Sequence, residues 1–445
     1  MKETDIINEI VKSVKPLCAD LHLTVDTDYH IRSSVGDTVS VDIVLLDQDN
    51  YPLAVFDVNK NLFFGEKNKA EKRQKHYLHE FVDNVGALIG FLTNGEEFLF
   101  IQPLEKSIFK TVDIQGVLDI LSNIKDYAIS NVAPNDLVEK LKSTLSFYIT
   151  QNPCLGQVLE GCTKSLILNH NQFSLGKDDE MKFIKSIIEY KESHRLCRYT
   201  SINSLFRIIN DKQDSMCGLA VMNDKSECYY LDKLLSRGVS SKLTDMSQAE
   251  IDELNIFFIN SLCRIDKEDD LTMWRLYGGD GRGVCIEYEV LDEYLSAGSN
   301  FYLMNVVYID QKKSSKALTI IRKLKTMARI HGYKFVFTQY DVWKHFFKPF
   351  DFSIEQEVRL LYQKPVKLPD SITEKWIYNG DYQITHPILV FNHTSQSEYP
   401  LVIKKIILGP KFSEMDTNVP QLKKLLREKG FKNVDVVPSK IDFYR

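Results

Sequence analysis

The sequence lacks any apolar run that approaches the length of a membrane span, so we expect no transmembrane helix. Its first residues, from Met1 to Asp5, do not form the apolar core of a signal peptide. The eight cysteines include no Cys-x-x-Cys pair and no Cys/His cluster with the spacing of a zinc site. Together these absences predict a cytoplasmic protein whose thiols are reduced and mostly buried.

A strong excess of charge of one sign is also missing. The 445 residues carry a formal net charge of -5 at pH 7, which argues against a general nucleic-acid coat but leaves room for local basic patches. With 44% hydrophobic and 26% charged residues, the composition is typical of a folded globular protein. The length predicts two or three domains, and no internal repeat is visible.

Two predicted strands near the N-terminus each carry an acidic residue. Residues 39–46 and 52–60 have the composition of strands, and a turn cluster separates them. Asp42 lies on the first strand and Asp57 on the second. Paired carboxylates hold Mg²⁺, and a nearby lysine helps to activate water for phosphodiester cleavage, so a divalent-metal site is one interpretation.

The order of elements over roughly residues 21–102 resembles the N-terminal nuclease-like domain of type I restriction enzyme R subunits, of the PD-(D/E)xK superfamily. The residues that carry the resemblance are Val41-Asp42-Ile43-Val44, Ala54-Val55-Phe56-Asp57-Val58-Asn59-Lys60, Gln74, Tyr77 and Gly90-Phe91-Leu92-Thr93-Asn94-Gly95. The family ends its second strand with an acid, one spacer and a lysine, but Asn59 stands in the lysine's place. Lys60 follows, and strand periodicity points it to the opposite face. The resemblance therefore implies a degenerate nuclease fold that binds Mg²⁺ only if its site is active, or an active nuclease in which Lys60 replaces the lysine.

A surplus of lysine and arginine follows between residues 60 and 75. Lys72 and Arg73 belong to this surplus, which could contact nucleic-acid phosphates. A solvated helix face explains the same charges equally well.

The middle of the chain predicts helices and no chemistry. Helical apolar spacing covers residues 114–124, 135–150 and 177–195, whereas residues 153–161 have the composition of a break. We interpret residues 126–195 as a helical connector.

The stretch from Phe352 to Tyr362 contains the pattern Glu355-x-Glu357-x-Arg359. On a strand, alternation places these three side chains on one face. Two carboxylates and a guanidinium are costly to bury, so they are paired or line a cleft. The alternatives are an edge strand with a solvated charged face and an active-site strand in which Arg359 holds the carboxylates in place.

A series of short motifs between residues 196 and 411 resembles an uncharacterised bacterial family that we relate to ADP-ribosyltransferases. The motifs are Arg198-Tyr199, Met222-Asn223-Asp224, Met273-Trp274 with Tyr277, Gly283-Val284-Cys285-Ile286, Glu355-x-Glu357-x-Arg359 and Ile406-Ile407-Leu408-Gly409. A long insertion lies between Tyr308 and Phe346. The resemblance implies a split β-sheet fold that cleaves NAD, whose nicotinamide–ribose bond breaks through a cationic state that a carboxylate stabilises.

In the arginine-serine-glutamate class of these enzymes, an arginine on the first strand contacts NAD and a Glu-x-Glu strand carries the catalytic glutamate second. The resemblance thus implies that Arg198 and Arg359 lie at the NAD site, Glu357 is the catalytic carboxylate and Glu355 orients or deprotonates the acceptor. One of the aromatic residues would stack on nicotinamide, and the candidates are Tyr199, Trp274 and Tyr277. The class also expects Ser-Thr-Ser in the middle element, where this chain has Ser215-Met216-Cys217. Two alternatives stay open: Arg198 pairs with Glu355 or Glu357 as a staple between strands, and the aromatics are core packing.

The insertion is strongly basic. From Lys312 to Lys348 there are ten Lys and Arg against one acid, with helical apolar spacing followed by an aromatic-rich run. Such a segment fits a nucleic-acid partner, which Arg322, Lys323 and Lys325 would contact. A solvated helix with an apolar underside fits equally well.

The sequence as a whole predicts an α+β protein in three parts. These are a degenerate restriction-nuclease-like α/β/α domain (1–125), the helical connector (126–195) and an ADP-ribosyltransferase-like split-sheet domain (196–445). The predicted function is an NAD-cleaving effector that transfers ADP-ribose to a protein or nucleic acid or hydrolyses NAD, in bacterial anti-phage defence. The alternatives are a non-catalytic nucleic-acid-binding protein and a metal-dependent nuclease. The sequence does not predict the oligomeric state.

Overall fold

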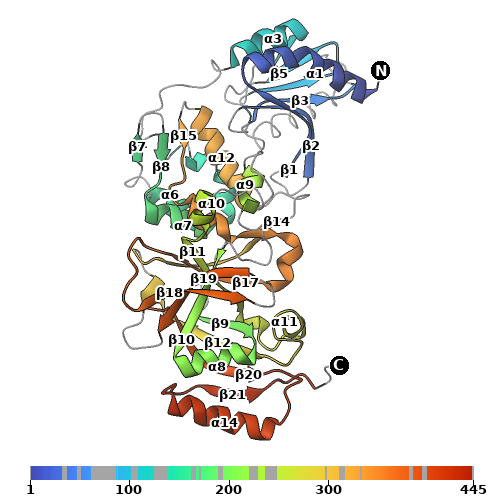
Figure 1. The fold of residues 1–445 in the computed structure, drawn as a ribbon. Coiled ribbons are helices and arrows are strands. Elements are labelled where there is room, and N and C mark those ends of the chain that lie inside the picture. Colours follow the sequence, from blue (N-terminus) through green and yellow to red (C-terminus); the bar gives the residue numbers. More distant parts are fainter. Residues whose placement is uncertain are drawn as a thin grey trace. The chain divides into compact units, whose positions relative to one another are not determined.

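The computed structural model describes residues 2–32, 38–47, 52–61, 87, 89–101, 109–124, 136, 139, 141–143, 145–161, 167–169, 172–188, 194–219, 229–235, 248–295, 298–309, 316–330, 333–379, 384–392 and 398–442. The fold is a mixture of helices and several sheets, as the predicted α+β class requires (Figure 1). It divides into two compact units. Unit 1 comprises Met1–Glu189, Lys233–Gly238 and Ile309–Asp341, and unit 2 comprises Tyr190–Asp232, Val239–Tyr308 and Val342–Arg445. In the described part of the chain, no helix has the length and apolarity that crossing a membrane requires.

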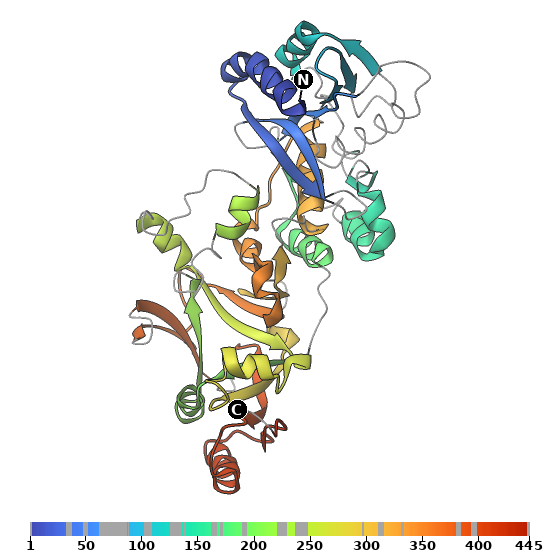
Figure 2. The same ribbon diagram turned by 90° about the vertical axis from the view of Figure 1, so that its right-hand side faces the viewer.

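Unit 1 begins with a six-stranded sheet in the order β1 to β6, in which only β3 and β4 pair in parallel. The elements are α1 (Glu3–Asp20), β1 (Thr24–Arg32), β2 (Thr38–Leu46), β3 (Pro52–Val58), β4 (Ile89–Thr93), β5 (Phe98–Ile101), β6 (Phe109–Val112) and α3 (Ile114–Ser122). β1 and β2 form a long antiparallel ribbon (Figure 2). The apolar faces of α1 and α3 pack on the sheet in one core, because their buried residues recur at helical spacing, as Ile6, Ile10 and Val14 show.

The rest of unit 1 joins the middle of the chain to the insertion. Its elements are α5 (Ser146–Gln151), α6 (Pro153–Gly161), β7 (Ile167–Asn169), β8 (Gln172–Ser174), α7 (Lys177–Ile187), α12 (Lys316–Ile330) and β15 (Lys334–Phe335). The prediction of a break at residues 153–161 is wrong, because Pro153 is the first residue of helix α6, where a missing N–H costs nothing. β15 of the insertion pairs in parallel with β8. The carboxylate of Glu180 on α7 is fully buried and accepts the backbone N–H groups of Thr338 (2.7 Å) and Gln339 (2.9 Å).

Unit 2 is built on a forked sheet in which all described strand pairs except β20 with β21 are antiparallel. Its elements are β9 (Arg195–Thr200), α8 (Ile202–Asp211), β10 (Gln213–Gly218), α9 (Tyr230–Leu235), α10 (Gln248–Leu254), β11 (Phe257–Arg264), η6 (Ile265–Lys267), α11 (Leu271–Leu276), β12 (Val284–Val290), η7 (Asp292–Leu295), β13 (Phe301–Asn305), β14 (Val307–Ile309), α13 (Tyr340–Trp343), η8 (Lys344–Phe346), β16 (Phe347–Pro349), η9 (Phe350–Glu355), β17 (Glu357–Gln363), β18 (Ile372–Asn379), β19 (Ile384–Asn392), β20 (Leu401–Leu408), α14 (Met415–Glu428) and β21 (Asp435–Pro438). The strand order is β18-β19-β10-β11-β9-β12-β20-β21, and β17 pairs with β11 and β13.

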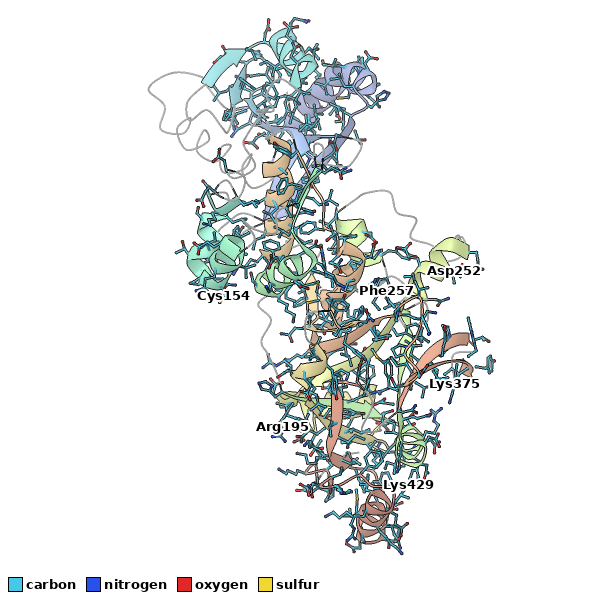
Figure 3. All side chains as sticks on the ribbon, turned by 90° about the vertical axis from the view of Figure 1, so that its left-hand side faces the viewer. Cys154, Arg195, Asp252, Phe257, Lys375 and Lys429 are labelled. Atoms are coloured by element: carbon cyan, nitrogen blue, oxygen red, sulfur yellow. The ribbon has the colours of Figure 1, made fainter. Side chains whose placement is uncertain are left out.

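The fork lies along β11. Figure 3 labels Phe257, the first residue of this strand. One edge of β11 pairs with β17 over seven residues. The other edge pairs with β10 near its start and with β9 near its end, through Cys263 and Arg264. β9 and β10 therefore diverge from a shared neighbour.

The two faces of this sheet have different contents. One face carries the main core of unit 2, which includes Leu196, Leu262 and Ile286. The opposite face carries a smaller cluster around Cys197, Cys263 and Trp274. Directly opposite residues of antiparallel strands share a face, so the register of each strand assigns its side chains to one face or the other.

Candidate active site

The charged pattern of residues 355–359 divides between two elements. β17 begins at Glu357, whereas Glu355 ends the 3₁₀ helix η9, and Gln356 between them has a positive φ of 44°. The expectation that Glu355 lies on the strand is therefore wrong. Glu357 and Arg359 do share a face of β17, as alternation predicts.

The charges of β17 are buried. β17 lies between β11 and β13, and the exposed fraction is 3% for Glu357 and 1% for Arg359. The alternative of a solvated edge strand is therefore wrong.

Glu357 is bound by two cations. Its Oε1 accepts a hydrogen bond from Nε of Arg359 at 2.8 Å, and its Oε2 accepts one from Nη2 of the same guanidinium at 3.0 Å and lies 2.9 Å from Nζ of Lys348. An ionised carboxylate offers about four acceptor positions, so cations occupy most of those of Glu357.

The electrostatics of Glu357 follow from these contacts. Burial alone would raise the pKa of this carboxyl, but the charges of Arg359 and Lys348 and the hydrogen bonds outweigh burial and lower its pKa to about 2. Glu357 is therefore ionised throughout the neutral range, with its charge neutralised by its neighbours.

Glu355 has fewer partners and lies at the end of the cluster. Its Oε2 accepts Nζ of Lys348 at 3.0 Å, and its Oε1 accepts the hydroxyl of Tyr277. Two of its roughly four acceptor positions are thus in use. Tyr277 is 40% exposed, and burial of the hydroxyl together with the bond to Glu355 raises the pKa of this tyrosine. Tyr277 and Glu355 form the open side of the cluster, with Lys348, Glu357 and Arg359 behind them.

Two further residues complete the cluster. The hydroxyl oxygen of Tyr308 accepts the backbone N–H of Glu357 at 2.9 Å, and the carbonyl of His345 accepts Nη1 of Arg359 at 2.5 Å. The ring of His345 is buried, and neither ring nitrogen has a hydrogen-bond partner among the described residues. Burial and the nearby cations Lys344 and Arg359 lower the pKa of His345 well below its usual range, so the ring is neutral at pH 7.

The structure does not bring Arg198 to this cluster. Glu357 lies directly opposite Cys263, and Cys263 lies directly opposite Cys197, so these three side chains share a face. Arg198 follows Cys197 on β9 and points to the other face. There Nη1 of Arg198 donates to the buried carboxylate of Asp214 at 3.1 Å. The alternative in which Arg198 pairs with Glu355 or Glu357 is therefore wrong.

Asp214 closes a polar network at the fork of the sheet. Its second oxygen accepts the hydroxyl of Tyr288 at 3.0 Å. Asp214 lies on β10 and Arg198 on β9, so their ion pair joins the two diverging strands.

Two of the three aromatic candidates are core residues. Trp274 is fully buried, packs edge-on against the ring of Tyr199 at 4.8 Å, and donates its indole N–H to Asp269 at 2.8 Å. The hydroxyl of Tyr199 donates to the carbonyl of Lys267 at 2.7 Å and accepts the N–H of Asp270. Both rings are therefore committed to packing, and Tyr277 is the aromatic candidate that lies at the cluster.

The basic residues of the insertion lie on a half-buried helix. Arg322, Lys323 and Lys325 on α12 are all intermediate in exposure, and Arg322 donates to the carbonyl of Leu234 at 3.2 Å. The ammonium of Lys323 lies 5.9 Å from the ring centre of Tyr148. The aromatic run that follows α12 is largely buried, so these rings are not open platforms for bases.

The N-terminal carboxylates lie on neighbouring strands, as predicted. Oδ2 of Asp42 accepts the N–H of Val58 at 2.6 Å. Burial, Asp42 and Glu3 raise the pKa of Asp57 to about 7. The described residues contain no group of three or more potential metal ligands, and Asn59 takes the place of the lysine. The Mg²⁺ site stays a prediction. Lys72 and Arg73 lie outside the described residues.

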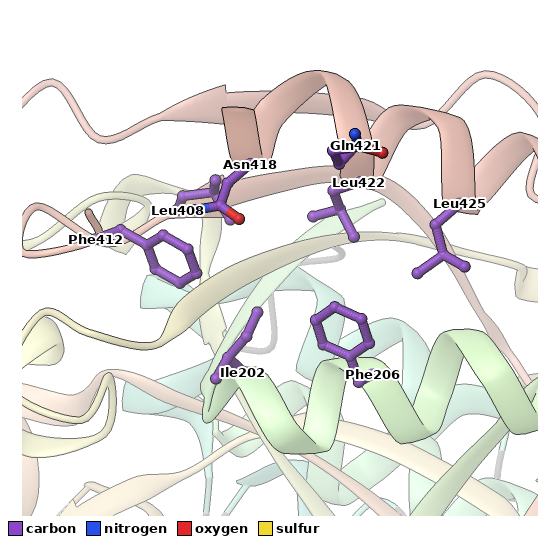
Figure 4. A pocket seen from close by; sticks show the side chains of 8 residues that line it. All are labelled: Ile202, Phe206, Leu408, Phe412, Asn418, Gln421, Leu422 and Leu425. Atoms are coloured by element: carbon purple, nitrogen blue, oxygen red, sulfur yellow. The ribbon is translucent and has the colours of Figure 1, made fainter. Parts of the chain in front are cut away.

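A separate groove in unit 2 lies between α8 and α14 (Figure 4). Its volume is about 240 Å³, and six apolar side chains and the amides of Asn418 and Gln421 line it. No titratable group lines this groove, so the carboxylate cluster is the candidate active site.

Sequence reasoning missed Lys348 and Tyr308. Lys348 was counted with the basic residues of the insertion, although it precedes Glu355 by only seven positions. A lysine so close to two buried carboxylates was the available signal for a counter-ion. Tyr308 carried no signal, because its contact is with a backbone N–H.

Residues 273–360 match the model of a family described as "Protein of unknown function (DUF2971)". The matched segment includes Tyr277, Lys348, Glu355 and Glu357, so most of the cluster lies within it. This match supports the predicted resemblance to an uncharacterised family over that segment. The relation to ADP-ribosyltransferases stays a prediction.

No curated protein matches the chain. Among solved structures, the chain is similar to one titled "cryoEM structure DrdV-DNA complex", with 12% identity and a TM-score of 0.19. The similarity covers 36% of this chain and 17% of that chain. With so low a TM-score, this similarity carries no argument about fold or function.

Proposed function

We propose that unit 2 cleaves the nicotinamide–ribose bond of NAD and transfers ADP-ribose to a macromolecule or to water. The observation that carries this proposal is the unequal state of the two carboxylates. Glu355 is paired with one cation and keeps acceptor positions beside the half-exposed Tyr277, whereas both oxygens of Glu357 are bound by the cations Arg359 and Lys348. We therefore assign the reacting role to Glu355 rather than to Glu357.

The proposed chemistry uses Glu355 as an electrostatic stabiliser. When the bond from ribose C1′ to nicotinamide breaks, the electron pair leaves with nicotinamide and positive charge develops on the ribose. A carboxylate fixed near the ribose stabilises that charge and accepts a hydrogen bond from a ribose hydroxyl. The acceptor, a hydroxyl, amine or water, then attacks C1′ and loses its proton.

The residues of the cluster fit the nicotinamide–ribose end of NAD better than its phosphates. The exposed ring of Tyr277 offers a stacking surface next to Glu355. Arg198, which the resemblance would place on the phosphates, lies on the opposite face of the sheet. We therefore assign Arg198 a structural role at the fork and leave it out of the NAD site.

The biological setting is part of the proposal. A nuclease-like unit joined to an NAD-cleaving unit suits an effector of bacterial anti-phage defence, with a protein or nucleic acid as acceptor, by analogy. The half-buried state of α12 gives the nucleic-acid-binding alternative no specific support.

The test is NAD consumption by the purified full chain, with and without added nucleic acid. We expect Glu355→Gln to abolish turnover while the protein stays folded, because glutamine keeps the shape and removes the charge. Glu374→Gln is the matched control, since Glu374 pairs with Lys364 at 3.1 Å on another part of unit 2. Equal turnover in the wild type and Glu355→Gln would refute the assignment, and an inactive wild type under every condition would refute the proposed function.

A further inference from the structure

Lys348 lies between the two carboxylates of the cluster. It sits on β16, and only 6% of its side chain is exposed. Its Nζ is 3.0 Å from Oε2 of Glu355 and 2.9 Å from Oε2 of Glu357. The 3₁₀ helix η9 follows β16 directly and brings Glu355 back to the lysine seven residues later.

The two cations of the cluster, Arg359 and Lys348, pair with the carboxylates differently. Arg359 forms a bidentate pair with Glu357. Lys348 contacts both carboxylates, and among the described residues it is the cation bonded to Glu355. The ring of Phe352 lies 5.3 Å from the ammonium. The charges of two carboxylates and two cations thus balance in a buried space. Removal of Lys348 would leave Glu355 next to Glu357 without a cation partner.

Like charges that share a buried site do not both stay ionised. Because Glu357 keeps its bidentate partner, the proton taken up after loss of Lys348 would go to Glu355. A protonated Glu355 would turn from an acceptor into a donor and could no longer stabilise positive charge on a ribose.

We propose that Lys348 is a positioning residue, which keeps Glu355 ionised and turned toward Tyr277. The inference rests on the proposed function only for its catalytic consequence. Its structural content, a carboxyl whose protonation depends on one lysine, is measurable without any substrate.

The first measurement is infrared difference spectroscopy on the full chain at pH 7, in which protonated and ionised carboxyls absorb at different frequencies. We expect a protonated-carboxyl band in Lys348→Met that is absent from the wild type and from Lys348→Arg. This band should disappear in Lys348→Met/Glu355→Gln. Lys364→Met, which removes the partner of Glu374, is the control and should show no new band.

The second measurement is the pH profile of NAD turnover. In Lys348→Met we expect the acid limb of kcat/KM to move to higher pH, so that the loss of turnover is larger at low pH than at high pH. Lys348→Arg should restore most of the wild-type profile. A purely structural lysine would change turnover equally at all pH values.

The outcomes separate the two proposals. A folded Lys348→Met without the new band, or with a band that depends on Glu357 instead of Glu355, overturns the role of Lys348. If Lys348→Met does not fold, Lys348→Gln undergoes the same infrared measurement under the same criteria. An inactive wild type removes the proposed function, and the infrared result then still decides the role of Lys348.

Discussion

Replacing Glu357 by glutamine tests whether the ion pairs of this glutamate stabilise the folded protein. The variant leaves Arg359 without its carboxylate partner in a buried site, while Lys348 keeps its pair with Glu355. Removing one partner of a buried ion pair costs about 3–5 kcal/mol. The lowered pKa gives a similar figure, because a change from the usual 4.5 to about 2 corresponds to about 3 kcal/mol. Either value is a large part of the 5–15 kcal/mol that typically stabilises a folded domain.

The pH dependence of stability provides a second test of this prediction. A carboxyl whose pKa is lower in the folded than in the unfolded protein stabilises the fold above the unfolded value, here 4.5. That contribution is lost as pH falls through the folded value of about 2. The difference between the wild type and Glu357→Gln should therefore be full at pH 7 and should shrink between pH 4.5 and pH 2.

Urea unfolding followed by tryptophan fluorescence is the appropriate assay. The three tryptophans, Trp274, Trp343 and Trp376, all belong to unit 2, so the signal does not depend on the unfolding of unit 1. Glu374→Gln is the matched control, because its half-buried pair with Lys364 is worth about 1 kcal/mol or less. If Glu357→Gln is no less stable than Glu374→Gln at pH 7, Glu357 does not stabilise the folded protein and the prediction is wrong.

Two further predictions concern unit 1, whose unfolding is followed as the circular-dichroism transition that tryptophan fluorescence does not report. Burial and Asp42 raise the pKa of Asp57 from 3.8 to about 7, so the wild type should lose stability as pH rises between these values. Asp57→Asn should therefore be more stable than the wild type at pH 8, by roughly 2–4 kcal/mol. An unchanged pH dependence of stability in Asp57→Asn would contradict this. Glu180→Gln should destabilise unit 1 by roughly 2–3 kcal/mol, because an amide turned toward the N–H groups of Thr338 and Gln339 leaves a buried donor unsatisfied. A stability equal to that of the wild type would show that these hydrogen bonds of Glu180 are dispensable.

Local patterns predicted the elements of this protein well. The apolar spacing of residues 114–124 predicts a helix that the structure confirms as α3. The strand composition of residues 39–46 and 52–60 likewise predicts strands that the structure has as β2 and β3. These signals are contained in a few adjacent residues, so the sequence suffices for them.

Tertiary packing decided what the sequence could not. Arg198 looks like a partner for Glu357 because both carry a complementary charge, but the strand register places them on opposite faces of the sheet. Lys323 looks like a surface cation, yet α12 is packed on several sides and holds it near the ring of Tyr148. Which face a residue occupies depends on pairing between distant strands, and no local pattern records that pairing.

The cluster also explains why a repeated residue type need not repeat a role. Glu355 and Glu357 are two positions apart and look equivalent in the sequence, but the left-handed backbone at Gln356 separates the end of a 3₁₀ helix from the start of a strand. The strand places Glu357 where a guanidinium and an ammonium bind both of its oxygens, and the helix leaves Glu355 on the open side next to Tyr277. A carboxylate bound by two cations fixes its neighbours in place, whereas one with fewer partners has acceptor positions left for a ligand. Under the proposed function, the partners of each glutamate, more than its order in the motif, therefore determine which of the two acts on a substrate.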